Sequence, residues 1–506
     1  MLVPARSDAA VAARTSRAVR VASVSTETWL VGGLVALGAV LRFSTLGAQS
    51  YWFDEAQAAH ELHLSLGAML SRMVAVETAP PLYFVLGWAW AHLFGTGEVA
   101  LRSLSALAGT ALIPVAYLCG RELVSRRAGV LTAAFVAVNP FMVWYSQEAR
   151  EYMLVALLCG ASLLYFLRAW RDPSGRNIAW WTLFSVLALL THYFAAFLIA
   201  PEALWLLYIA RNRASVIAVG AVGVVQLALI PLLVGHATAS LLSFITGTHL
   251  STRIQEVPIA FALGPPFETT LFSYGLLGAA ILAAIVIFLV LAGAEPDELR
   301  GVGVASALAA VVLLVPLVLA LLGEDYYIDR ALIPAWLLLA IVVAAACTTR
   351  RFRVPGAILA AIVLVGFAYG LVRINTDAQY QRPDWRGVAQ ALGPPSGRRA
   401  IIVYDGLAID PLVVYLPGVP LTDPVGPVDI SEVDVVGYPW QATPVGLPRH
   451  VKLIATKRVD DSLVARFSIA GGWRLTPGQI ANTGSSLLGP APQGAAVLLQ
   501  GTRTNG

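Results

Sequence analysis

The chain has 506 residues, of which 58% are hydrophobic and 13% are charged, and its net charge is +4. Soluble proteins usually carry about twice this fraction of charged residues, so the composition excludes an ordinary soluble domain and indicates a membrane protein. Nucleic acid is not an expected partner, because the arginines are scattered between apolar runs and form no single basic patch.

The first element is a basic N-terminus followed by an apolar run over residues 29–46. Residues 1–28 include four arginines, Arg6, Arg14, Arg17 and Arg20. A cleaved signal peptide is one interpretation of this pattern. We favour a first membrane span behind a cytoplasmic N-terminal segment of residues 1–28, because more membrane-type sequence follows and the first loop needs a tether.

Eleven further apolar runs follow the first. Most of them are long enough to cross a hydrocarbon core of about 30 Å as a helix. The run over 178–191 is the weakest of the expected spans, because it is short and ends in a Thr-His pair. The runs cover approximately residues 81–94, 99–119, 128–145, 152–168, 178–191, 194–210, 214–234, 271–293, 301–322, 331–347 and 354–371.

Clusters of arginine between these runs predict the topology. The positive-inside rule places the clusters and the N-terminus in the cytoplasm. This parity requires that the run over 81–94 does not cross, and its 14 residues reach only about 21 Å as a helix. We therefore predict eleven spans and a juxtamembrane helix over 81–94 on the outer surface. The clusters lie at 121–127, 168–176, 211–213 and 350–353.

The C-terminal part differs in character from the rest. It is rich in proline and glycine, and short β-like runs occur at 400–404, 451–455 and 495–499. A helix start is expected near Pro383, Asp384 and Trp385. We predict a transmembrane domain over 29–372 and a small extracytoplasmic α/β domain over 373–506.

The first charged motif on the outer side is Tyr-Trp-Phe-Asp-Glu at 51–55, directly after the first span. Asp54 as a helix N-cap is the structural interpretation, and a catalytic base at the membrane surface is the functional one. Further along, Glu77 precedes Pro80 and Pro81, which can begin a helix. Glu77 either faces the positive end of that helix or binds a ligand.

The segment over 144–152 brings three charges to a span boundary. Such charges are costly unless they are solvated or paired. An internal network of Glu148, Arg150 and Glu151 would explain them structurally, and substrate binding is the functional alternative.

The last outer motif, over 324–330, ends in Arg330 directly before a span. A guanidinium at this place suits a phosphate, because its planar fork binds two oxygens. A salt bridge to Asp329 or Asp325 is the structural alternative.

Histidines on the outer side leave a metal site open as a hypothesis. His60, His63 and His192 could join Glu77 around a divalent ion, and hydrogen-bonded surface histidines are the alternative. No other cofactor is indicated, because the chain has neither a GxGxxG motif nor a P-loop.

Together these motifs resemble the glycosyltransferase C superfamily, and the fold class expected is its polytopic helical type. The chain is similar to bacterial members related to protein O-mannosyltransferases and to the aminoarabinose transferase that modifies lipid A. The resemblance covers most of residues 29–375. It rests on Trp-x-Asp-Glu at 52–55, Pro-Pro-Leu-Tyr at 80–83, the stretch 94–102, Gln-Glu-Ala-Arg at 147–150 and Arg-x-Leu-Ile-Pro at 330–334.

The resemblance implies transfer of a sugar from a polyprenyl-phosphate carrier, usually with inversion, on the extracytoplasmic side of the cell membrane. It implies that Asp54 is the general base and that Glu55 supports it. Arg150 and Arg330 would hold the carrier phosphate, and Glu148 would contact the sugar or the acceptor.

Glu77 and Tyr327 complete the expected substrate-binding set. Many relatives carry His-Pro-Pro where this chain has Ala79 before two prolines. A role that depends on that histidine, including binding of a metal, is therefore not implied here.

We predict a multi-pass glycosyltransferase that uses a lipid-linked hexose or pentose and a glycan, lipid or protein acceptor. A transporter or lipid flippase is the main alternative, but it would normally place polar residues near the bilayer midplane. An inactive scaffold whose C-terminal domain binds a cell-wall partner is the second. The concentration of ionisable residues at the outer face favours the enzyme.

Overall fold

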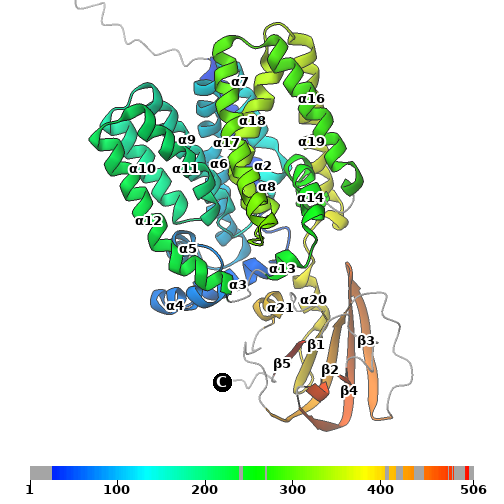
Figure 1. Ribbon diagram of the computed structural model, residues 1–506. Helices are drawn as coiled ribbons and strands as arrows, with labels where there is room; N and C mark the ends of the chain where they lie inside the picture. Colours follow the sequence, from blue (N-terminus) through cyan, green and yellow to red (C-terminus); the bar gives the residue numbers. More distant parts are fainter. Residues whose placement is uncertain are drawn as a thin grey trace, which may run out of the picture.

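The computed structural model shows a helical bundle with a small sheet domain at one end (Figure 1). We call that end of the bundle the domain-side end. The predicted basic N-terminus, with its four arginines, lies outside the described residues apart from its last three positions. The structure describes residues 26–238, 243–267, 271–404, 409–416, 426–437, 449–476, 478–480, 482–483 and 496–500.

Within these residues, nine helical segments are long and apolar enough to cross a membrane. A bent pair, α7 (Arg126–Val138) and α8 (Pro140–Ser146), makes a tenth span, and α10 (Gly175–Leu189), with 15 residues, is the short run that the sequence marked as weakest. The other helices of the bundle are α2 (Thr26–Phe43), α6 (Glu98–Leu123), α9 (Tyr152–Arg171), α11 (Ala196–Ala210), α12 (Arg213–Thr238), α16 (Gly275–Gly293), α17 (Pro296–Leu321), α18 (Ile333–Thr348) and α19 (Arg353–Thr376).

The predicted span over 128–145 is not one straight helix, because α7 and α8 meet at an angle of 55°. Pro140 cannot continue the hydrogen bonds of α7, and Asn139 caps α8 instead. The fully buried Arg42 of α2 donates to the carbonyls of Val136 (2.8 Å) and Ala137 (2.9 Å) at the end of α7. The guanidinium of Arg42 thus binds carbonyl groups that the end of α7 leaves without helical partners, and it helps to fix the direction of α8.

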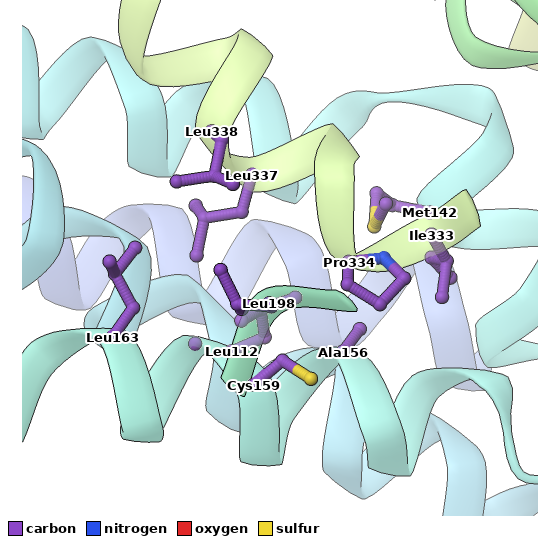
Figure 2. A pocket seen from close by; sticks show the side chains of 11 residues that line it. Leu112, Met142, Ala156, Cys159, Leu163, Leu198, Ile333, Pro334, Leu337 and Leu338 are labelled. Carbon is purple, nitrogen blue, oxygen red and sulfur yellow. The ribbon is translucent and has the colours of Figure 1, made fainter. Parts of the chain in front are cut away.

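The centre of the bundle is apolar and closely packed. Figure 2 shows the side chains that line a small cavity there. Its volume is about 10 Å³, which is scarcely large enough for one water molecule. It cannot hold a prenyl chain or a transported solute. Its walls come from α6, α8, α9, α11 and α18 and are formed by Leu112, Met142, Ala156, Cys159, Gly160, Leu163, Leu198, Ile333, Pro334, Leu337 and Leu338.

A polar cluster joins three helices within the bundle. The fully buried Glu202 of α11 accepts hydrogen bonds from Ser162 Oγ of α9 (2.6 Å) and from Trp181 Nε1 of α10 (2.9 Å). Because a buried carboxyl group is costly without such partners, these bonds hold the three helices together.

Short helices gather at the domain-side end, as Figure 1 shows. They are α3 (Phe53–Leu62), α4 (Leu66–Val76), α5 (Leu82–Phe94), α13 (Ser243–Thr246) and α14 (Leu250–Leu263). The helix α5 confirms the short helix predicted over 81–94, and its 13 residues are too few to span a bilayer.

The C-terminal domain is a five-stranded sheet with strand order β3-β4-β2-β1-β5. The neighbours β1 and β2 are parallel and the other pairs are antiparallel. Two helices, α20 (Trp385–Leu392) and α21 (Ile409–Tyr415), cover one face with apolar side chains. The strands are β1 (Arg399–Val403), β2 (Val428–Gly437), β3 (Val451–Val459), β4 (Ser462–Leu475) and β5 (Ala496–Gln500).

These elements confirm the predicted small α/β domain. Its three predicted strands appear as β1, β3 and β5, and α20 begins where a helix start was expected, with the Asp384 side chain accepting from the amide of Gly387 (2.9 Å). The strands β2 and β4 were not predicted.

The orientation in the membrane can be tested at the two ends of α6. This helix has 26 residues and is about 39 Å long, so Thr96 and Ser125 lie on opposite sides of a bilayer. We expect a membrane-impermeant maleimide to label Thr96→Cys on intact cells and Ser125→Cys only after permeabilisation. The native chain is the control, because its three cysteines are buried. The reverse pattern would overturn the predicted topology.

Candidate active site

Asp54 lies in the first turn of α3, at the domain-side end of the bundle. It is not the N-cap, because the helix already begins at Phe53. Its side chain is partly exposed, and among the described residues its carboxylate has no hydrogen bond or ion pair. The positive end of the helix stabilises a negative charge at this position. Asp54 therefore presents its carboxyl group without a competing partner among the described residues.

The neighbouring Glu55 points the other way and is completely buried. Both of its oxygens bind Arg102, at 2.7 and 2.6 Å, and one of them also accepts from the amide of Ala149 (2.9 Å). Burial alone would raise the pKa of Glu55, but Arg102 and Arg382 outweigh it and hold that pKa below its ordinary value. Glu55 thus ties the helix that carries Asp54 to the loop after α8.

Arg150, on that loop, is engaged by two glutamates. Its guanidinium binds both oxygens of Glu77, at 3.1 and 3.0 Å, and its Nε lies 3.1 Å from Glu151. The predicted network therefore forms in part, with Glu77 in the place expected for Glu148. A phosphate would have to compete with two carboxylates for Arg150.

Acidic charge exceeds basic charge around Arg150. Besides Glu77 and Glu151, the fully buried Glu61 of α3 faces this cluster. Burial raises the pKa of Glu61, and burial together with Glu61 raises the pKa of Glu77 against the attraction of Arg150. Arg72 Nε lies 3.6 Å from Glu61 Oε1 and offsets part of this negative charge from the exposed side.

Arg330 lies in a short 3-10 turn (Asp329–Leu332) directly before α18. Its guanidinium lies 5.8 Å from the ring centre of Trp52 and 6.0 Å from that of Tyr152. It lines a cavity of about 220 Å³ together with residues of α8, α13 and α14. The aromatic faces stabilise a cation at this part of the cavity wall.

The two aspartates proposed as salt-bridge partners of Arg330 make other contacts. Asp325 pairs with Arg253 of α14 at 2.9 Å, and Asp329 accepts from the Tyr145 hydroxyl at 3.0 Å. Arg253 and Asp329 line the same cavity, so its wall carries charges of both signs.

Tyr327 does not line the cavity beside Arg330. Its side chain is 5% exposed and packs in the core of the bundle, and the cavity beside Arg330 is lined by the next residue, Ile328. Its carbonyl accepts from Arg253 and so helps to hold that arginine in place.

The weak metal candidates, Glu77, His60 and His192, do not come together. Glu77 binds Arg150, and the His192 ring accepts from the amide of Phe194 (3.1 Å). Over the described residues, no group of three or more His, Cys, Asp or Glu could hold a metal ion. The geometry therefore gives no support to the metal hypothesis.

Four of the predicted site residues, two buried and two partly exposed, form one constellation. Asp54 is close enough to Glu148, Arg150 and Arg330 to interact with each of them electrostatically. An ionised carboxylate beside a guanidinium can take a proton from one group while a negative charge forms on another.

Comparison with known proteins gives matches of two kinds. The family described as Dolichyl-phosphate-mannose-protein mannosyltransferase matches residues 78–234. The structure of ArnT from Cupriavidus metallidurans bound to undecaprenyl phosphate has a TM-score of 0.52 at 15% identity, over 88% of this chain and 99% of that chain. Residues 78–234 of the chain thus resemble a family of membrane mannosyltransferases, and the chain as a whole has the fold of ArnT.

The same fold similarity extends to ArnT in the apo state, with a TM-score of 0.50 and 14% identity over 87% of this chain and 98% of that chain. No curated protein matches the chain. The coverage of both chains shows that the shared architecture includes the helical bundle and much of the C-terminal domain.

The sequence did not predict roles in this site for Arg382, Arg102 or Glu61. Arg382, on the segment between α19 and α20, donates to Glu148 Oε2 at 2.8 Å and to the carbonyl of Gln147 at 3.1 Å. Its guanidinium lies 4.3 Å from the ring centre of Trp144. Little in the sequence indicated this role, because Arg382 lies outside the recognised motifs, directly before Pro383 and after the last apolar run.

Proposed function

We propose that the chain is a glycosyltransferase that takes a sugar from a polyprenyl-phosphate carrier and passes it to a glycan, lipid or protein acceptor on the extracytoplasmic side of the cell membrane. One observation carries the proposal: Asp54, a carboxylate without a protein partner among the described residues, lies beside Arg330 at the mouth of a span. The solved ArnT structure with undecaprenyl phosphate supports the class of carrier.

The reaction needs two groups at opposite ends of one displacement. An acceptor hydroxyl attacks the anomeric carbon, and Asp54 takes the hydroxyl proton as general base. The bond between that carbon and the phosphate oxygen breaks, and the polyprenyl phosphate leaves with an additional negative charge. Arg330 stabilises that charge. A single displacement of this kind inverts the configuration at the anomeric carbon.

The neighbouring charges organise this centre. Burial raises the pKa of Glu148 to about 7, against the attraction of Arg382. Its Oε1 atom has no hydrogen-bond partner among the described residues, so it is suited to a hydroxyl of the sugar or the acceptor. Arg150 already pairs with Glu77 and Glu151, so it is better placed to support the loop that carries Glu148 than to bind a phosphate.

The function is tested by incubating the purified protein with a panel of radiolabelled polyprenyl-phospho-sugars and a membrane extract. Movement of label from one donor to a new acceptor, with release of polyprenyl phosphate, is the expected result. Absence of transfer from every hexose and pentose donor, in a preparation that remains folded, would contradict the proposal and leave a transporter or scaffold.

Variants at Arg330 test the phosphate contact. Arg330→Ala should weaken binding of a polyprenyl-phosphate analogue by about 1.5–3 kcal/mol, the usual contribution of a charged hydrogen bond. Arg330→Lys should also be impaired, because a point charge does not reproduce the planar fork. Binding to detergent-purified protein is the measurement, and Asp329→Asn is the control. Unchanged affinity in both arginine variants, with lowered melting temperatures, would remove Arg330 from the site.

A further inference from the structure

The segment over 380–386 connects the helical bundle to the sheet domain and is held on the bundle. Its backbone binds the loop after α2, where Gln49 Oε1 accepts from the amide of Arg382 (3.0 Å). Ser50 Oγ donates to the carbonyl of Pro383 (2.8 Å) and accepts from the amide of Trp385 (3.0 Å). The segment therefore has a defined position against the loop that leads to Asp54.

A second set of contacts fixes the domain behind this segment. Arg386 donates to Glu98 Oε1 at the start of α6 (2.7 Å), and the Tyr415 hydroxyl of α21 binds the same oxygen. The amide of Tyr51 donates to that hydroxyl (2.7 Å). Glu98 thus gathers one side chain from each of two parts of the C-terminal domain.

The side chain of Arg382 extends from this anchored backbone into the candidate active site. It is 6% exposed, it binds Glu148 at 2.8 Å, and it lies 4.0 Å from Glu55. Burial of an arginine is costly unless its partners compensate its charge. Here the partners are Glu148, which is proposed to contact the substrate, and Glu55, which holds the helix of Asp54.

We propose that Arg382 is a positioning residue for sugar transfer: it holds Glu148 and the loop of Gln147 beside Asp54, so that the C-terminal domain completes the active site. This inference rests on the proposed function. It gives the domain a part in the chemistry that is separate from any binding of an acceptor.

The charge of Arg382 makes this role measurable. Four charged groups face Glu148, namely Arg382, Glu55, Asp54 and Arg330. Arg382 is the cation that binds the Glu148 carboxylate directly, so its removal disfavours the ionised form further. The acid limb of the pH–activity profile should then move to higher pH, which a purely structural contact would not cause.

The experiment uses the full purified chain with Arg382→Gln, Arg382→Lys and, as a matched control, Arg386→Gln. The control removes an ion pair from the same segment without touching Glu148. We expect Arg382→Gln to lower kcat at neutral pH by about tenfold or more, the usual effect of losing a charged hydrogen bond, and to shift the acid limb upward. Arg382→Lys should restore part of the shift, and Arg386→Gln should show the wild-type profile.

A second measurement does not depend on activity. Glu148, with its raised pKa, stabilises the fold below its unfolded-state pKa, and this contribution is lost as pH rises through the folded-state value of about 7. Without Arg382 the pKa of Glu148 in the folded protein is higher still, so more stability is lost as pH rises. The difference in melting temperature between Arg382→Gln and wild type should therefore widen with pH. Glu148→Gln should abolish that widening.

The outcomes separate the two proposals. A pH profile and a melting-temperature gap that do not change in Arg382→Gln overturn the role of Arg382, even if the wild type transfers sugar. A wild type that transfers no sugar, with a gap that widens and depends on Glu148, refutes the proposed function and the catalytic part of this inference. If Arg382→Gln does not fold, Arg382→Lys with and without Glu148→Gln decides, because coupled residues give non-additive effects.

Discussion

Asp54→Asn is expected to lower turnover by at least about 100-fold, the usual scale for loss of a general base. Asparagine keeps the shape of the side chain and removes its capacity to take a proton. Because the carboxylate has no partner among the described residues, its removal breaks no contact in the fold. Protein yield and melting temperature should therefore stay close to those of the wild type.

The matched control for this variant is Asp297→Asn. Asp297 also lies in the first turn of a helix, but its side chain is 93% exposed and it belongs to α17. Initial rates of transfer from a labelled donor, at saturating donor and acceptor, give the comparison. Near-normal turnover in Asp54→Asn would assign the base to Glu55 or to another acid.

Arg102→Met should cause the largest loss of stability, about 3–5 kcal/mol, because it leaves Glu55 buried without its compensating charge. The arginine is 1% exposed and binds both oxygens of Glu55. It also donates to the backbone carbonyls of Leu46, Gln49 and Ser50, at 2.7, 2.7 and 3.0 Å. Methionine cannot replace any of these bonds.

Melting temperature in detergent measures this effect. The control is Arg126→Met. Arg126 binds Glu27 at 3.2 Å on the exposed surface, where solvent screens the pair, so a much smaller loss of stability is expected. The double variant Arg102→Met with Glu55→Gln should recover part of the stability, since the uncompensated charge is then gone. Equal melting temperatures for Arg102→Met and Arg126→Met would show that Glu55 does not depend on this pair.

The features that follow from local pattern could be predicted from the sequence. Apolar run length and arginine parity gave the spans and the helix α5, and they placed Asp54, Glu148 and Arg330 together at one end of the bundle. Turn and capping signals located the start of α20. These patterns depend on neighbours in sequence or on a uniform solvent, so they need no knowledge of tertiary contacts.

The partners within the site could not be predicted, because they come from distant parts of the chain. Arg102 and Arg382 reach Glu55 and Glu148 from other elements, and no sequence spacing marks such pairs. The same reason explains why strand β2 was not predicted. It buries Glu432 and Asp434, which pair with arginines of neighbouring strands, although acids in a strand usually indicate solvent exposure.

The docking of the C-terminal domain has a consequence for biosynthesis. A chain leaves the ribosome from its N-terminus, so the helices that bear Asp54 and Glu148 are made before Arg382. The sheet behind Arg382 closes only when β5 pairs with β1 along residues 496–500. Until Arg382 has been made, Glu148 has no such cation beside it. If Arg382 positions Glu148 as proposed, the site is completed only after every membrane helix has been synthesised.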